Sequence, residues 1–351
     1  MSKTGTSVAV VILNWNGKSL LEEFLPSVVA TAYPNAVIYV ADNGSTDDSC
    51  AFVSAHFPSV KLIKLGENHG FSGGYNRAID LIEEDHTVLL NSDVAVTPNW
   101  LDDLVKTLDK NPAIGIVQPK ILQQKKPTHF EYAGACGGFW DRWGYPFCRG
   151  RLIDELEEDQ EQYEDQTDVC WAGGCALVIR TSLYKRLGGL DEDFFAHFEE
   201  IDLCWRVWRS GSRIRVVPSS VVYHVGGATL GVSPRKTFLN FRNSLVFLLK
   251  NASWSYFIEA FIARLVLDGV AGLVYLLRKQ PEHIWPIIKA HWDFFLRFPF
   301  WLKKRRETQK ILQGFTPIEP PAYGFSIIFR FFIKKQKHFT QLFGLIENKK
   351  Q

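Results

Sequence analysis

Hydrophobic residues in the first hundred positions form short continuous runs, separated by segments with helical spacing. The run at 8–13 is rich in β-branched residues, the pattern of a strand that is buried on both faces of a parallel sheet. The alternation continues along the chain. Further strands are expected at 36–40, 60–65 and 87–90, with helices at 19–31, 46–57 and 75–84. Strands that alternate with helices predict a doubly wound α/β sheet.

Polar residues and glycines follow the predicted strands, at the point where each strand ends. In open α/β sheets, ligands bind beyond the carboxyl ends of the strands. We therefore expect the functional site to be built from these strand ends. They are the segments 14–17, 42–45, 67–74 and 91–93.

The regular pattern is lost from 123 to 167, where glycines, aromatic residues and an acidic run at 154–159 occur. Runs of like charge usually stay exposed, so a solvated loop is expected, and a mobile flap over the site is the alternative. Regular structure is expected again at 176–179, followed by a helix at 181–187. Glycine and proline interrupt the pattern between 225 and 237, so a catalytic domain at 1–230 and a C-terminal region at 231–351 are predicted.

The C-terminal region is predicted to be helical at 239–278 and 284–304. The segment 257–277 has the length of a membrane span. It also contains three charged residues that would be costly at the centre of a bilayer, so a helix buried in protein or lying in the membrane interface is favoured. These residues are Glu259, Arg264 and Asp268.

Tryptophans and cations in the same region are typical of an interfacial membrane anchor, with an amphipathic helix packed on its own domain as the alternative. The tryptophans are Trp285, Trp292 and Trp301, followed by the basic run 303–306. The net charge of the 351-residue chain is only +2, which excludes a general polyanion-binding character. Six scattered cysteines without a CxxC pair indicate reduced, buried thiols, and the N-terminus does not have the pattern of a secretory signal.

Two segments have the chemistry of a nucleotide site. Asp42 could accept hydrogen bonds from a base or a ribose, and Gly44 would let the backbone turn closely around the ligand, although an ordinary turn and helix cap has the same residues. The segment 67–78 is a glycine-rich loop that opens a helix, where free N–H groups and Arg77 would attract phosphate. It matches neither the dinucleotide-binding nor the P-loop pattern.

A metal site and a base are the other candidates. Asp93 ends a strand, where its carboxylate could hold Mg²⁺ or Mn²⁺, and His224 is a possible second ligand, although a lone histidine after an apolar strand is often structural. The acidic residues of 194–206 lie among aromatic residues, which would raise the basicity of a carboxylate that deprotonates a hydroxyl. A favourable helix N-terminus is the alternative. The acids are Glu199, Glu200 and Asp202.

The ordered set of these motifs resembles the family 2 glycosyltransferases, which have the GT-A fold, and particularly their bacterial rhamnosyltransferase-like members. The resemblance covers roughly residues 8–243. It implies a Rossmann-like mixed sheet flanked by helices, with a C-terminal helical extension. The motifs are Asn14-Trp15-Asn16-Gly17, the segments 42–47 and 67–78, Asn91-Ser92-Asp93, Trp171-Ala172-Gly173-Gly174 and Glu199-Glu200-Ile201-Asp202.

The resemblance also implies an inverting, single-displacement reaction with Mn²⁺ or Mg²⁺. Asp93 would be the last residue of a degenerate DxD motif, and His224 would complete the metal shell. The base falls on Glu200, where the family usually has aspartate, so Glu199 and Asp202 stay candidates. Acceptor-side residues would be Trp171, Gly173 and Gly174. Nucleotide-sugar contacts would come from Asn14, Asn16, Asp42, Asn43, Gly44, Asn68, Gly73, Asn76, Arg77, Asn91 and Ser92.

The function expected from this resemblance is transfer of rhamnose or a similar sugar from a nucleoside-diphosphate donor to a glycan or lipid-linked acceptor in cell-surface polysaccharide synthesis. The enzyme would be cytoplasmic and peripherally bound to an anionic membrane surface, with no nucleic-acid partner. A pyrophosphorylase would need a glycine- and lysine-rich N-terminal loop, which 14–17 lacks. A non-catalytic scaffold with a decayed site is the second alternative. Retention of Asp42, Asp93, Glu200 and His224 argues against it.

Overall fold

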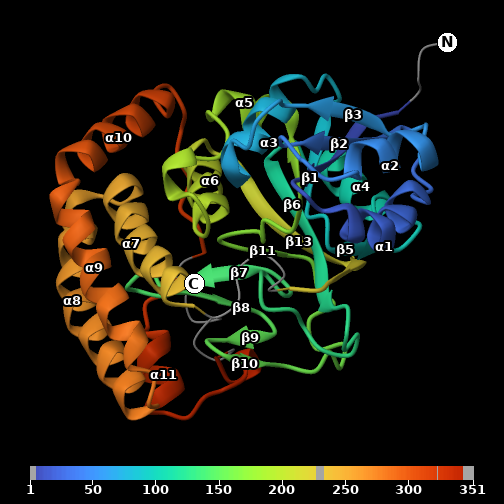
Figure 1. Ribbon diagram of the computed structural model, residues 1–351. Coiled ribbons are helices and arrows are strands. Elements are labelled where there is room, and N and C mark those ends of the chain that lie inside the picture. The colour runs from blue at the N-terminus through green and yellow to red at the C-terminus, as the bar shows by residue number, and fades with distance from the viewer. Residues whose placement is uncertain (1–4, 227–232, 322, 343–351) are drawn as a thin grey trace.

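The computed structural model describes residues 5–226, 233–321 and 323–342. A nine-stranded mixed sheet lies at its centre, in the order β11-β13-β6-β12-β4-β1-β2-β3, with β5 paired to β13 (Figure 1). Its strands are β1 (Val8–Asn14), β2 (Ala36–Asp42), β3 (Lys61–Lys64), β4 (His86–Leu90), β5 (Val94–Val96), β6 (Ile114–Gln123), β11 (Thr167–Asp168), β12 (Ala176–Arg180) and β13 (Arg213–His224).

The order and direction of the strands confirm an α/β fold with a mixed sheet. β1 pairs in parallel with both β2 and β4, as the buried N-terminal runs predict. β12 is antiparallel to its neighbours β4 and β6, and β5 and β11 are antiparallel to β13, so the sheet is mixed. As a result, residues far apart in sequence, such as Leu90 and Ala176, lie side by side at the ends of neighbouring strands.

Helices cover both faces of the sheet. The helices of the N-terminal part are α1 (Lys18–Val29), α2 (Ser49–His56), α3 (Gly70–Asp80), α4 (Asp102–Lys110), α5 (Thr181–Arg186), η1 (Glu192–Phe194) and α6 (Glu199–Arg209). Helix α3 begins within the glycine-rich segment and five residues before the expected start, so part of that predicted loop is its first turn. One hydrophobic core packs α1, α2 and α4 on one face, and a larger core packs α3, α5 and α6 on the other.

The segment from 123 to 167 is not a solvated loop. It forms a second, four-stranded sheet with a buried aromatic core that includes Phe139 and Phe147. The acidic run is engaged as well, since Asp159 pairs with Lys120 at 2.8 Å and Glu157 accepts a hydrogen bond from Tyr163 at 2.8 Å. The cation that neutralises Asp159 is distant in sequence, so the local pattern could not reveal this ion pair. The strands are β7 (Gly138–Trp140), β8 (Pro146–Cys148), β9 (Arg151–Leu152) and β10 (Glu155–Leu156).

The C-terminal helices pack against the larger core, and α8 and α9 run side by side on the outside, away from the central sheet (Figure 1). The boundary expected at 230 lies outside the described residues. The helices are α7 (Pro234–Asn251), α8 (Trp254–Leu277), η2 (Pro281–His283), α9 (Ile284–Leu296), α10 (Phe298–Ile311), α11 (Ile327–Phe332) and η3 (Phe339–Leu342).

Helix α8 is the one described helix that is long and apolar enough to cross a membrane. Its buried Arg264 donates to Asp268 at 3.0 Å, and His291 of α9 lies 3.0 Å from Asp268. This face of α8 is therefore fixed to the protein, in agreement with the expected cost of its charges. Trp301, expected at the membrane interface, is instead 1% exposed and buried in the core. Its neighbour Arg305 is buried too, donating to the carbonyl oxygen of Ala252 at 2.7 Å.

Candidate active site

The ends of β1 and β2 bring Asn14 and Asp42 together. The two residues are direct partners in the parallel register, and Nδ2 of Asn14 donates to Oδ1 of Asp42 at 3.2 Å. Asp42 also accepts from the backbone N–H of Ser45 at 3.2 Å. Asp42 is thereby held in one orientation at the sheet edge, where parallel-sheet proteins bind ligands.

The adjoining loops are tied to one another by amide side chains. Asn43 donates to Oδ1 of Asn68 at 3.1 Å, and Oδ1 of Asn16 accepts from the backbone N–H of Thr46 at 2.7 Å. Gly44 has φ +76°, and a side chain there would overlap the backbone of Glu67. Asn16, Asn43, Gly44 and Asn68 thus hold three loops together beside Asp42.

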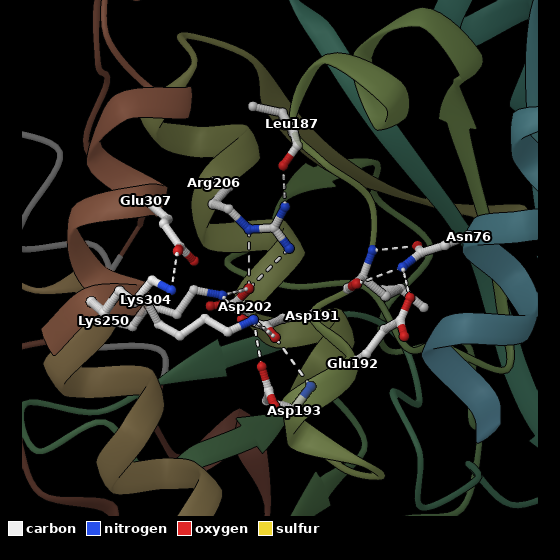
Figure 2. Close-up of polar contacts among 12 residues, drawn as sticks. Asn76, Leu187, Asp191, Glu192, Asp193, Asp202, Arg206, Lys250, Lys304 and Glu307 are labelled. Carbon is white, nitrogen blue, oxygen red and sulfur yellow. Dashed lines mark hydrogen bonds and ion pairs between the residues drawn. The ribbon is translucent and has the colours of Figure 1, made fainter. Parts of the chain in front are cut away.

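Asn76 and Arg77 of α3 point to the segment that precedes α6. Asn76 donates to the carbonyl oxygen of Leu190 at 2.8 Å, and Arg77 pairs with Glu192 at 3.1 Å (Figure 2 shows the Asn76 contacts). Gly73 lies beside the Arg77–Glu192 pair, since a Cβ on it would be 3.0 Å from Nη1 of Arg77 and 3.1 Å from Oε2 of Glu192. The predicted phosphate-binding residues of α3 therefore link the donor-side loops to the approach to α6.

The pairing of β5 with β13 builds a cluster of metal-ligating groups. His224 is the register partner of Val94, so its ring meets Asp93, and Nε2 lies 3.1 Å from Oδ1 of that carboxylate. Its other ring nitrogen lies 3.4 Å from Oε2 of Glu131. Ligand atoms of Glu131, Cys175 and His224 all lie within 4.8 Å of one another. Two residues expected from the sequence thus lie beside two that were not.

The chemistry of this donor set fits a divalent cation. Asp93, Glu131 and His224 are all buried, and each offers an oxygen or an imidazole nitrogen, the ligands that suit Mn²⁺. Burial alone would lower the pKa of His224, but Cys175, Asp93 and Glu131 raise it well above its ordinary value. The surroundings thus stabilise positive charge at the ring, whether it is carried by a proton or by a metal ion.

The three acids of the α6 N-terminus have different surroundings. Asp202 is fully buried and accepts from Arg206 at 3.0 Å and from Lys250 at 2.8 Å. Oε2 atoms of Glu199 and Glu200 are buried without a hydrogen-bond partner in the described part of the chain. Burial raises the pKa of Glu200 to about 7, and burial together with the Glu200 charge raises that of Glu199 well above its usual range. Glu200 therefore ionises first of this coupled pair.

The expected acceptor-side residues fall into two groups. Trp171 is buried, and its Nε1 donates to the carbonyl oxygen of Phe139 at 2.9 Å, so its ring belongs to the core. At Gly173 a side chain would overlap the carbonyl oxygen of Ala133, whereas at Gly174 a Cβ would lie 3.4 Å from Cβ of Glu200. Gly174 is thus the wall against which Glu200 packs.

Short connections join the acid pair to the metal-ligating cluster. Gly174, which contacts Glu200, is followed directly by Cys175 of the cluster. The carbonyl oxygen of Cys175 accepts from the backbone N–H of Asn91 at 2.9 Å, which brings half-buried Asn91 and Ser92 to the same place. The segment that carries Asp93 is therefore linked through Cys175 and Gly174 to Glu200.

A separate pocket of about 400 Å³ lies behind α6, between the 187–193 segment and α10. Figure 2 shows its charged residues turned toward one another: Lys250 lies 2.6 Å from Oδ2 of Asp191, and Lys304 lies 3.0 Å from Oδ1 of the same residue. Burial opposes the charge of Asp191, but the two lysines hold its pKa below the ordinary value. These ion pairs fasten α7 and α10 to the catalytic part.

Glu131 was not predicted as a site residue from the sequence, and Cys175 was expected only to be a buried thiol. Glu131 lies in the segment without a periodic pattern, and it reaches His224 because an isolated bridge joins Phe130 to Leu122 beside the end of β6. Cys175 follows the Gly173-Gly174 pair, so its position next to a recognised motif was the one available signal.

The chain is similar to several known glycosyltransferases. An N-acetylglucosaminyl-diphospho-decaprenol L-rhamnosyltransferase of Mycobacterium tuberculosis is 29% identical over 251 residues, covering 64% of this chain and 78% of the relative. The low-salt glycan biosynthesis hexosyltransferase Agl10 of Haloferax volcanii is 25% identical, covering 80% and 88%. The crystal structure of GalNAc-T7 with UDP, GalNAc and Mn²⁺ superimposes with a TM-score of 0.59 at 17% identity, covering 85% of this chain and 59% of that one.

The fold is that of the GT-A glycosyltransferases. The family model described as "Glycosyltransferase like family 2" matches residues 5–243, and the chain belongs to this family. Rhamnosyltransferases are among its relatives, and enzymes of glycan biosynthesis recur among them. The family, the fold and the enzyme class expected from the sequence are thereby confirmed.

Proposed function

We propose that this enzyme transfers rhamnose or a similar hexose from a nucleoside-diphosphate donor to a lipid-linked saccharide, with inversion at the anomeric carbon. The observation that carries the proposal is the buried Asp93–His224 pair, together with Asp42 at the end of β2 and the buried, unpartnered Oε2 of Glu200. The relatives that act on decaprenol-linked and glycan substrates support the acceptor class.

The proposed reaction is one displacement. Glu200 takes the proton of the acceptor hydroxyl, the acceptor oxygen bonds to the anomeric carbon, and the bond from that carbon to the diphosphate breaks. A pKa of about 7 lets Glu200 be ionised at neutral pH and still basic enough to accept a proton. Asp202 is saturated by Arg206 and Lys250, so we assign it a structural role. Asp42 would bind the base or ribose of the donor.

Asp93 and His224 would hold Mn²⁺ or Mg²⁺, with the Glu131 carboxylate, 3.4 Å from the second ring nitrogen, orienting the ring. When bound, such an ion stabilises the negative charge of the departing diphosphate. Asn91 cannot supply the first carboxylate of a full DxD motif, so Asp93 carries more of the ligand charge.

A binding experiment tests the donor site. We expect UDP, dTDP or GDP to raise the melting temperature, and Mn²⁺ to increase the shift for the preferred nucleotide. At a ligand concentration of 100 Kd the stabilisation is about 2.7 kcal/mol, a shift that calorimetry resolves easily. NAD serves as the control nucleotide. Absence of any response to the three diphosphates in a folded sample would favour the scaffold hypothesis.

We also propose that the enzyme works on the cytoplasmic face of a membrane and binds it through the outer face of α8 and α9. This face is apolar and exposed. Because soluble monomers rarely expose large apolar patches, such a face indicates an interaction surface. Its residues are Ile258, Ile262, Val266, Leu273 and Leu277 of α8, and Trp285, Ile288, Trp292 and Leu296 of α9. The exposed cations Arg278, Lys279 and Lys289 lie at the same helices and suit anionic lipid.

Charge placed on this face should weaken membrane binding. The double variant Val266→Glu and Leu273→Glu removes two side chains that are 65% and 55% exposed, and each lost apolar contact should lower the affinity for vesicles by about tenfold. Flotation with phosphatidylglycerol vesicles measures this, and Leu81→Glu, on the catalytic part and 65% exposed, is the matched control. Membrane docking would be contradicted if the wild-type protein formed a stable dimer in the absence of lipid and the double variant were monomeric.

A further inference from the structure

The backbone that leads into α6 has an unusual conformation. Three non-glycine residues in a row of four, Phe195, His197 and Phe198, have φ between 68° and 74°. L-residues rarely adopt such angles, and they persist only where surrounding contacts determine them. Phe198 is the N-cap of α6 and directly precedes Glu199 and Glu200. The direction in which both carboxylates leave the chain depends on this segment, residues 194–198.

The contacts that determine the segment come from α7. The amide nitrogen of Asn243 donates to the carbonyl oxygens of Phe194, Ala196 and His197, at 3.0, 2.8 and 2.7 Å. Asn243 is completely buried, so water cannot replace these bonds. The Asn243 side chain therefore binds three carbonyl oxygens of the segment that contains the positive-φ residues.

A second α7 residue fixes the orientation of that amide. Arg242 donates to Oδ1 of Asn243 through Nε at 2.8 Å and through Nη2 at 2.6 Å. The same Nη2 reaches the carbonyl oxygen of Phe194 at 3.0 Å. Because both donors of the arginine occupy the oxygen, the amide nitrogen must face the 194–198 segment.

Helix α7 also holds the start of α6 itself. Lys250 and Asn251 donate to the two carboxylate oxygens of Asp202, at 2.8 and 2.7 Å. These residues lie about two turns after Asn243, on the same side of α7. Helix α7, which lies outside the central sheet, therefore binds both the segment before α6 and Asp202 in the first turn of α6.

We infer that Asn243, oriented by Arg242, is a positioning residue that sets the 194–198 segment and thereby aims Glu200 at the acceptor hydroxyl. The inference rests on the proposed role of Glu200 as the base. The hydrogen bonds of the buried Asn243 side chain go to Arg242 and to the 194–198 backbone, so it acts through the backbone it holds. Misplacement of a catalytic group by about 1 Å costs roughly 10²-fold in rate.

The test is Asn243→Asp, which preserves size but replaces the donor by an acceptor facing three carbonyl oxygens. We expect kcat to fall by about 10²-fold, with the Kd for the nucleoside diphosphate unchanged, because the donor site belongs to other elements. The acid limb of the pH profile of kcat/KM, which reports the free enzyme, should also move from about 7 toward 4.5, as Glu200 leaves its buried environment. A purely structural role would change stability without this shift. Half-buried Asn240→Asp, on the same helix, is the matched control.

The assay uses dTDP-rhamnose or the nucleotide sugar preferred in the binding experiment, with N-acetylglucosaminyl-diphospho-decaprenol as acceptor. If Asn243→Asp does not fold, Arg242→Gln retains the amide but frees it to turn, and about a tenfold loss of kcat is expected. Wild-type kcat and pH profile in the folded variant would overturn the inference. Glu200→Gln is measured in parallel: activity there would overturn the base assignment, whereas its inactivity beside an unaffected Asn243→Asp would overturn the positioning role alone.

Discussion

Replacing Glu200 by glutamine should lower kcat by about 10³-fold while the nucleotide affinity stays unchanged. Glutamine fills the same volume beside Gly174 but cannot accept a proton, and loss of a general base costs roughly 10² to 10⁴-fold. The carboxylate of Glu200 has a buried oxygen without a hydrogen-bond partner in the described residues, so the packing around it should survive the change. Steady-state kinetics of diphosphate release would measure the effect.

The pH dependence gives this prediction a second readout. Because burial raises the pKa of Glu200 to about 7, wild-type kcat/KM should fall as the pH drops below 7, where the base of the free enzyme becomes protonated. Glu199 has its pKa raised further and stays protonated longer, so Glu199→Gln should preserve much more activity and serves as the matched control. If Glu199→Gln is the inactive variant and Glu200→Gln is not, the two roles must be exchanged.

The sheet could be predicted well because its strands are buried on both faces and leave continuous apolar runs. The run at 8–13 is β1, and the two short runs that follow it are β2 and β3, with small shifts at the ends. The segment 123–167 could not be predicted, since β9 and β10 have two residues each and no period emerges from such lengths. Its acids are neutralised by residues such as Lys120 and Lys337, whose proximity only the folded chain determines.

The site residues that lie at the ends of buried strands could be predicted from the sequence. Asn14, Asp42 and Asp93 follow buried strands, and the register of parallel strands brings such residues together. Glu131 has no such marker. The local sequence does not distinguish the three acids at 199–202. They differ in the structure because Lys250 of α7 donates to Asp202, whereas Oε2 of Glu200 is buried without a hydrogen-bond partner in the described residues.

Replacing Asp93 by alanine should lower transfer by about 10³-fold and remove the effect of Mn²⁺ on nucleotide binding. The carboxylate faces Nε2 of His224 at 3.1 Å in a buried cluster, and a metal that stabilises the departing diphosphate contributes several kcal/mol to the rate. Calorimetric titration of Mn²⁺ with the preferred diphosphate measures the metal separately from turnover. Alanine leaves His224 with Glu131 on its other nitrogen, so the strand pairing should hold, as circular dichroism can verify.

The substitution Glu131→Gln separates ligand from support within the same cluster. If Glu131 orients His224, glutamine should weaken Mn²⁺ binding by only about 10 to 100-fold, since the amide oxygen can still accept from the ring. A loss as large as that of Asp93→Ala would make Glu131 a direct ligand, with Cys175 as its neighbour. Full activity and Mn²⁺ dependence in Asp93→Ala would contradict the metal site, because Asp93 supplies the carboxylate that lies 3.1 Å from Nε2 of His224.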